Sequence, residues 1–179
     1  MSGKNVPGCR CDVCPLRDAP GPVLPEARWT APYAVVGDFP GDVDVREERP
    51  FCGPAGMMMN KEFGGVGVQR SSMHLTNAIL CQPPGNNMKV LDAKTRGRNA
   101  EIRKANTVRR NADKKAKVKH YPTPMIPSPL ACCRPRLARE LAHFKRIVPL
   151  GGEALKTIMG GTPSIMKMRG SLIDGDLLY

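Results

Sequence analysis

Three short apolar runs lie far apart along the chain and have the composition of buried β-strands. They cover residues 33–36, 73–80 and 147–150. The first run ends in the sequence Gly-Asp-Phe-Pro-Gly, whose glycines and proline predict a sharp loop directly after the strand.

Helical patterns occupy three other segments. Residues 55–63 follow a Gly-Pro pair and precede a Gly-Gly pair, which are helix start and stop signals. In residues 136–145, apolar side chains at i, i+4 and i+7 share one helix face, and a third helix is expected over residues 151–159. Strands that alternate with helices predict an α/β fold, here a three-layer α/β/α sandwich around a short, mainly parallel sheet.

Two segments depart from this pattern. Residues 1–32 are rich in Pro and Gly and predict an irregular lead-in. Residues 88–120 contain twelve Lys or Arg and three Asp or Glu, a local charge of +9. Their apolar residues form no stripe at helical spacing, so this segment is either a solvated helix or disordered. Residues 120–130 contain four prolines and predict an extended connector. We expect one domain, residues 1–179, with a basic insertion at about residues 88–130.

Charge and composition exclude several protein classes. The net charge of +12 favours nucleic acid or another anionic surface as partner. The chain has no apolar run long enough to span a membrane, and its first residues lack the apolar stretch of a secretory signal. Seven cysteines, an odd number, argue against a disulfide framework. We expect a cytoplasmic or nucleoid-associated protein that is not secreted and whose thiols are available for a metal or cluster.

Four cysteines sit beside recognisable local motifs. Cys11 and Cys14 form a C-x2-C pair, Cys81 precedes the sequence Gln-Pro-Pro-Gly-Asn, and Cys133 precedes Arg-Pro-Arg-Leu. Two close thiolates and two distant ones suit either an iron–sulfur cluster or a structural zinc ion. Either the cluster or the zinc ion would bring three separate parts of the chain together.

Seven segments, in a fixed order, carry a resemblance to a known family. They are CDVCPL (11–16), VVGDFPG (35–41), RPFCGPAG (49–56), LTNAILCQPPGN (75–86), CRPRLAREL (133–141), IVPLGGEAL (147–155) and MRG (168–170). Through these segments the chain resembles the iron–sulfur uracil-DNA glycosylases of the family 4 type. The resemblance implies the uracil-DNA glycosylase fold. It also implies a structural 4Fe-4S cluster on Cys11, Cys14, Cys81 and Cys133, with zinc as the alternative filling. Cys132 is the alternative to Cys133, and Cys9 and Cys52 are left without a role.

The resemblance also assigns a substrate pocket. It implies hydrolysis of the N-glycosidic bond of deoxyuridine in DNA after base flipping, the first step of base excision repair. Phe51 would stack on uracil, Asn77 would read its edge, and the backbone of residues 37–41, including Gly37 and Phe39, would line the pocket. Asp38 stands where the family usually has Glu, and its carboxylate would orient the attacking water. Without the resemblance, a core aromatic, a strand-end cap and a turn residue explain Phe51, Asn77 and Asp38 equally well.

Two departures from the family limit the inference. The chain contains no His-Pro sequence and ends at SLIDGDLLY, so the last edge strand of the family fold is expected to be lacking. The alternative function is a catalytically weak or inactive DNA-binding module, or a replication accessory subunit that a partner chain completes. An insertion-bearing version of this kind also fits a phage protein.

The second departure is the basic insertion, for which the preferred reading is a DNA phosphate-binding arm. A covalent trap at His120, as in a crosslinking subclass of the family, is a minor alternative, and a solvated tail with another partner is the other. Eight candidate DNA-contacting residues lie in the insertion: Arg96, Arg98, Arg103, Lys104, Arg109, Arg110, Lys114 and Lys115.

Overall fold

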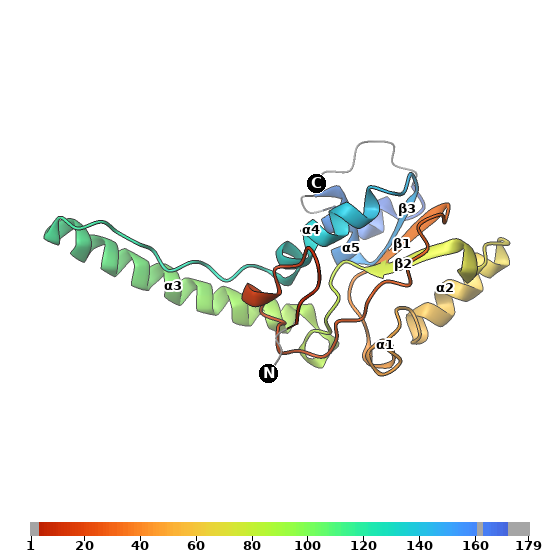
Figure 1. Ribbon diagram of the computed structural model, residues 1–179, viewed down its shortest axis with the longest axis horizontal. Helices are drawn as coiled ribbons and strands as arrows, with labels where there is room; N and C mark the ends of the chain where they lie inside the picture. The colour runs from red at the N-terminus through yellow and green to blue at the C-terminus, as the bar shows by residue number, and fades with distance from the viewer. Residues whose placement is uncertain (1–3, 161–162, 172–179) are drawn as a thin grey trace.

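The computed structural model describes residues 4–160 and 163–171 of the chain. Three parallel strands, β1 (Tyr33–Gly37), β2 (Met73–Asn77) and β3 (Ile147–Leu150), form a sheet in the order β2-β1-β3 (Figure 1). Strand β1 lies in the centre, so Val35 stands opposite Leu75 on one side and Val148 on the other. The predicted parallel sheet is confirmed.

Helices cover both faces of the sheet. Successive side chains of a strand point to opposite faces. Ala34 and Val36 therefore pack with side chains of α4 (Pro129–Leu141) and α5 (Gly152–Met159). Val35 packs on the other face, against Met59 of α2 (Pro54–Gly65) and against Phe51, Met73 and Leu75. These two apolar layers produce the expected α/β/α sandwich.

The predicted boundaries of two elements were wrong. Strand β2 ends at Asn77 rather than residue 80, and the N–H groups of Ala78 and Ile79 then donate to the carbonyls of Gly37 and Asp38. Helix α4 begins at Pro129, seven residues before the predicted start at residue 136, and ends at Leu141, four residues before the predicted end at residue 145. The side chain of Ser128 accepts a hydrogen bond from the N–H of Ala131 (3.1 Å) and so caps the helix. Proline suits the first helical position, because an N–H group there would have no acceptor within the helix.

Outside the basic insertion, the remaining elements are short. They are α1 (Asp42–Arg46), α6 (Ile165–Met168) and the 3-10 turns η1 (Cys11–Val13), η2 (Arg70–Ser72) and η3 (Pro84–Asn86). Over residues 4–32, the described part of the lead-in, the chain is irregular as predicted, apart from η1 and one antiparallel bridge between Glu26 and Leu75. The expectation about the last edge strand falls on residues 172–179, which lie outside the described residues.

The basic insertion is ordered. Its first part is a 29-residue helix, α3 (Met88–Ala116), and residues 117–128 return along it as an extended segment (Figure 1). We call α3 and residues 117–128 together the arm. Of the two readings left open by the sequence, the structure shows the solvated helix: only Met88 and Leu91 in α3 are buried. None of the described helices, α3 included, is both long and apolar enough to cross a lipid bilayer.

Candidate active site and cysteine centre

The candidate pocket residues gather where the parallel strands end. Gly37, the last residue of β1, stands opposite Asn77, the last residue of β2, and also opposite Leu150 of β3. Asp38 follows β1 directly. The carboxyl ends of parallel strands are the usual place for ligand binding in open α/β sheets, because loops from neighbouring strands converge there.

Gly37, Asn77 and Phe51 meet at one point. A Cβ atom on Gly37 would overlap Asn77 Oδ1 and would lie only 2.9 Å from Phe51 Cζ, so no larger residue fits between them. Asn77 is 3% exposed, and its Nδ2 has no hydrogen-bond partner among the described residues. A buried amide donor without a partner is costly unless something else binds it. The site thus offers a free N–H donor close to an aromatic ring.

Phe51 has a strained backbone that two carbonyl contacts hold in place. Its φ is 56°, a left-handed conformation that is unusual for a bulky residue. Arg70 donates to the carbonyl of Phe51 (2.9 Å) and to that of Pro50 (2.7 Å). The sequence did not reveal this role of Arg70, because its partners lie about twenty residues away.

Glu26 anchors Arg70 in turn. Its carboxylate accepts hydrogen bonds from Arg28 (2.9 Å), Arg49 (2.8 Å) and Arg70 (2.7 Å). Burial by itself would raise the pKa of Glu26, but the three guanidinium groups outweigh it and lower that pKa to about 2. The carboxylate is therefore ionised under ordinary conditions.

Asp38 is attached to the start of α5. Its Oδ1 accepts a hydrogen bond from the N–H of Ala154 (2.8 Å), so it caps a helix from another segment of the chain. Gly151 allows this approach: its φ is +134°, and any Cβ there would overlap the carboxylate. Burial raises the pKa of Asp38, although the donor from Ala154 opposes the shift. One carboxylate oxygen is thus fixed by the helix.

A buried charged network lies behind Asn77. Arg136 of α4 donates to the backbone carbonyl of Asn77 (2.7 Å) and to Thr76 Oγ1 (2.9 Å), and it forms an ion pair with Glu140. Glu140 also contacts His74 Nε2 (2.6 Å). Burial would raise the pKa of Glu140, but His74 and Arg136 lower it. This network was not predicted from the sequence, although Arg136 and Glu140 stand four residues apart beside the apolar face of a predicted helix.

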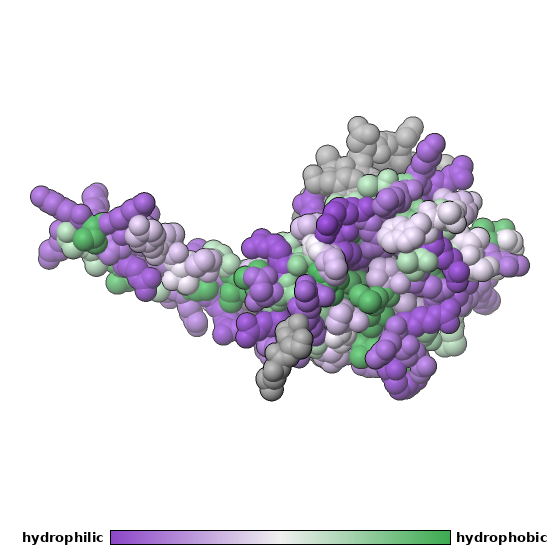
Figure 2. Space-filling view, viewed as in Figure 1, coloured by the Kyte–Doolittle hydropathy of each residue, from purple (hydrophilic) through white to green (hydrophobic). Residues whose placement is uncertain are grey.

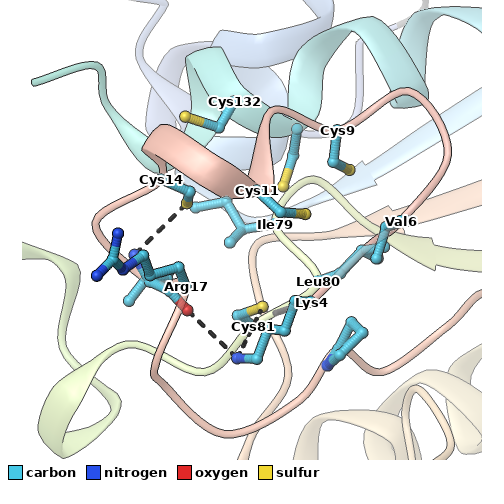
Figure 3. Close-up of a pocket in the computed structure, with 13 residues that line it drawn as sticks. Lys4, Val6, Cys9, Cys11, Cys14, Arg17, Ile79, Leu80, Cys81 and Cys132 are labelled. Carbon is cyan, nitrogen blue, oxygen red and sulfur yellow. Dashed lines mark hydrogen bonds between the residues drawn. The ribbon is translucent and has the colours of Figure 1, made fainter. Parts of the chain in front are cut away.

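Six of the seven thiols line one pocket, shown in Figure 3. They comprise the four predicted ligands and two further cysteines: Cys9, Cys11, Cys14, Cys81, Cys132 and Cys133. Cys9, which the sequence left without a role, therefore lies in this group. The seventh thiol, Cys52, lies elsewhere, near the carbonyl of Pro50 (3.9 Å). We call the six the cysteine centre.

Charge and burial differ among these thiols. The neighbouring Cys9 thiol lowers the pKa of Cys133, whereas burial raises the pKa of Cys14 to about 12. Burial raises the pKa of Cys81 to about 11, and Lys4 Nζ, which lies 3.6 Å from Cys81 Sγ, opposes this shift (Figure 3). Cys14 and Cys133 also pack among apolar side chains.

The donor set fits a metal cluster chemically, since its sulfur ligands are soft and come together from three segments of the chain. Across residues 4–160 and 163–171, however, no three His, Cys, Asp or Glu side chains are arranged to hold a metal ion. The thiols line the same pocket without reaching coordination geometry. The side chain of Phe39, whose backbone is expected to line the substrate pocket, packs against this apolar cysteine core.

The eight predicted DNA-contacting residues all lie exposed on α3, which projects away from the sheet (Figure 1). His120 lies beyond the C-terminal end of α3, where its Nδ1 contacts Asp113 Oδ2 (2.8 Å). That end of the arm is far from the strand ends in Figure 1. The geometry therefore does not bring His120 together with Asp38 or Asn77.

Comparison with known proteins gives a consistent result. Residues 26–177 match the model of the uracil DNA glycosylase superfamily. A type-4 uracil-DNA glycosylase of Thermotoga maritima is 27% identical over 168 residues, which are 92% of this chain and 69% of that protein. A protein of the same name from Pyrobaculum aerophilum is 34% identical over 77 residues, 42% of this chain and 39% of that protein.

A third relative, the type-4 uracil-DNA glycosylase of Archaeoglobus fulgidus, is 37% identical over 57 residues, 31% of this chain and 28% of that protein. The matches thus span only part of the length of these curated relatives. The superfamily model nevertheless covers most of the chain, including all three strands and the residues at their ends. The chain belongs to the uracil DNA glycosylase superfamily.

Proposed function

We propose that this protein is a uracil-DNA glycosylase that hydrolyses the N-glycosidic bond of deoxyuridine in DNA. The observation that carries the proposal is Asn77 Nδ2, which is buried beside the ring of Phe51 at the end of strand β2 and has no hydrogen-bond partner among the described residues. A flipped base needs such a pair, because an aromatic ring stacks on its face while an amide binds its edge. The names of the relatives support the same substrate class.

The proposed roles follow from position. Phe51 stacks on uracil and Asn77 Nδ2 donates to its edge, while the absence of a side chain on Gly37 lets both residues lie close to the end of β1. Asp38 orients the attacking water through Oδ2, since the N–H of Ala154 already occupies Oδ1. A carboxylate in this place also stabilises positive charge that develops on the sugar. For both tasks Asp38 must be ionised.

The cysteine centre is proposed to hold a 4Fe-4S cluster on Cys11, Cys14, Cys81 and Cys133, with zinc as the alternative filling. The cluster would supply structural bracing rather than redox chemistry in the glycosidic step. Cys9 and Cys132 line the same pocket and are the candidate substitutes for any of the four. A purified protein with broad visible absorbance and bound iron supports the cluster, whereas a colourless, zinc-loaded protein contradicts it.

The experiment is a uracil-release assay on single-stranded DNA that contains one deoxyuridine. Wild-type protein is compared with Asp38→Asn and Asn77→Ala, and Asp42→Asn, whose carboxylate accepts from Gln82 (2.6 Å), serves as the matched control. The proposal is supported if wild type and the control release uracil at similar rates and the two site variants release it on the order of a hundredfold more slowly. If wild-type protein forms no more product than Asp38→Asn, the proposal is wrong.

A second function is favoured by one observation. The three histidines all lie away from the carboxyl ends of the strands: His74 pairs with Glu140, His143 contacts Trp29 edge-on, and His120 lies at the end of the arm. No described histidine is thus available to stabilise negative charge on uracil. The alternative is a glycosylase-like module that binds DNA with little catalysis, alone or with a replication protein or partner chain that completes it. Tight binding of uracil-containing DNA without base release in the same assay would select it.

A further inference from the structure

The arm contains a seven-residue repeat that the sequence patterns above did not reveal. Four times along α3, a Lys or Arg is followed three residues later by an Asp or Asn. The pairs are Lys89 and Asp92, Arg96 and Asn99, Arg103 and Asn106, and Arg110 and Asp113. Seven residues make nearly two helical turns, so each series forms a stripe along the helix.

The Asp/Asn stripe holds the returning extended segment. Asn99 donates to the carbonyl of Ile126 (2.9 Å) and accepts from its N–H (2.8 Å). Asn106 makes the same pair of bonds with Thr123 (2.9 and 2.8 Å), and Asp113 contacts His120 (2.8 Å). Each step of seven helical residues advances roughly 10 Å, and three residues of extended, proline-rich chain advance roughly 9 Å. The two segments therefore stay in register, which stiffens the arm.

The cations are left on the open surface. All ten Lys and Arg residues of α3 are exposed, and within the part of the chain that the structure describes none of them forms an ion pair. Residues 88–120 carry +9 of the total charge of +12. Figure 2 shows hydrophilic side chains along the length of the arm. Because the extended segment contacts Asn99, Asn106 and Asp113, these side chains face the segment, whereas the positive charge faces solvent.

We propose that the arm is a second DNA-binding element that contacts phosphates through the stripe of Lys89, Arg96, Arg103 and Arg110. This inference rests on the proposed function, which makes DNA the partner. The stripe spans about 32 Å, close to one turn of duplex DNA at about 34 Å. Tyr121 is the one Phe, Trp or Tyr between residues 88 and 128, so base stacking is not the mode of binding. The arm binds the backbone regardless of sequence and does not require uracil.

The test measures DNA binding as a function of salt with uracil-free probes, a 30-base-pair duplex and the matching single strand. Fluorescence anisotropy is recorded for wild type and for Arg96→Gln/Arg103→Gln/Arg110→Gln. The control, Lys61→Gln/Lys145→Gln/Lys167→Gln, removes the same charge from exposed positions on the body of the protein. Circular dichroism checks that both variants keep their helix content.

We expect the stripe variant to bind on the order of tenfold or more weakly than the control. On duplex DNA, the slope of log affinity against log salt concentration should be smaller in magnitude by about 2 to 3 for the stripe variant than for the control. Equal slopes for the stripe variant and the control overturn the proposal, as does tighter binding to RNA or to an acidic polypeptide than to DNA. Because the probes contain no uracil, loss of the proposed glycosylase activity would not change this result.

Discussion

At the scale of single residues, the candidate pocket depends on a strained phenylalanine. A left-handed backbone costs a bulky residue roughly 1 to 2 kcal/mol, so Phe51 keeps it only because its surroundings hold it. Arg70 provides two of these contacts and is itself fixed by Glu26. The orientation of the ring beside Asn77 is therefore a property of three residues that are distant in sequence.

Replacing Arg70 by Lys should loosen Phe51, because an ammonium group cannot bind both carbonyls and Glu26 in the same planar geometry. We expect KM for uracil release to rise about tenfold with a smaller change in kcat, since stacking acts on bound substrate and transition state alike. Steady-state kinetics measure both parameters. Arg46→Lys, in an exposed pair with Glu47, is the control, and equal effects in both variants would contradict the positioning role.

The ionised carboxylate of Glu26 should make the stability of the folded protein sensitive to acid. Its pKa is lowered to about 2 in the folded protein, so its contribution to stability is full above about pH 4.5 and declines as the pH falls toward 2. Partial exposure of its partners reduces the effect to roughly 1 to 2 kcal/mol. Urea unfolding at pH 6 and pH 3 should show a larger loss for wild type than for Glu26→Gln. An identical loss in both proteins would show that another group dominates.

At the scale of elements, the arm shows how a helix with almost no buried surface stays ordered. Only two of its 29 residues are buried, and a solvated helix of this composition has little tertiary support. The paired hydrogen bonds from Asn99 and Asn106 supply part of that support by attaching the extended segment. The proline content of that segment helps, because an extended proline-rich chain loses less entropy when it is ordered.

Removing both amides should detach the segment without unfolding the body of the protein. For Asn99→Ala/Asn106→Ala we expect faster limited proteolysis within residues 118–128, by about tenfold, because local opening is easier by roughly 1 to 2 kcal/mol. Mass spectrometry locates the cleavage. Asn111→Ala, at an exposed position of the same helix, should behave as wild type. Equal cleavage rates in the double variant and wild type would show that the amides do not hold the segment.

At the scale of the whole molecule, the cysteine centre joins the lead-in, the loop after β2 and the start of α4. The pocket is lined by residues of all three, and Leu16, Ile79 and Leu91 form an apolar core with Cys14 and Cys133. The base of the arm therefore begins where the lead-in and α4 meet. A cluster at this point would tie the arm to the body of the protein.

Loss of a cluster ligand should lower stability of the whole fold. We expect Cys11→Ser and Cys133→Ser to lose bound iron and visible colour and to unfold about 5 to 10 °C earlier than wild type. Iron analysis and thermal unfolding measure this. Cys52→Ser is the matched control, because Cys52 lies outside the cysteine centre. A coloured, iron-loaded Cys133→Ser protein would instead point to Cys132 or Cys9 as the ligand.

The sequence by itself determined the three strands, two of the helices and the four motif-bearing cysteines, because strand hydrophobicity, glycine and proline signals and C-x2-C spacing are local. Only the tertiary structure decided that α4 starts earlier, that the basic insertion forms a helix with a returning segment, and that Cys9 belongs to the cysteine centre. It also decided the roles of Arg70 and Arg136. The physical reason is the same in each case: these features depend on hydrogen bonds and packing between segments far apart in the chain, and no local pattern encodes a distant partner.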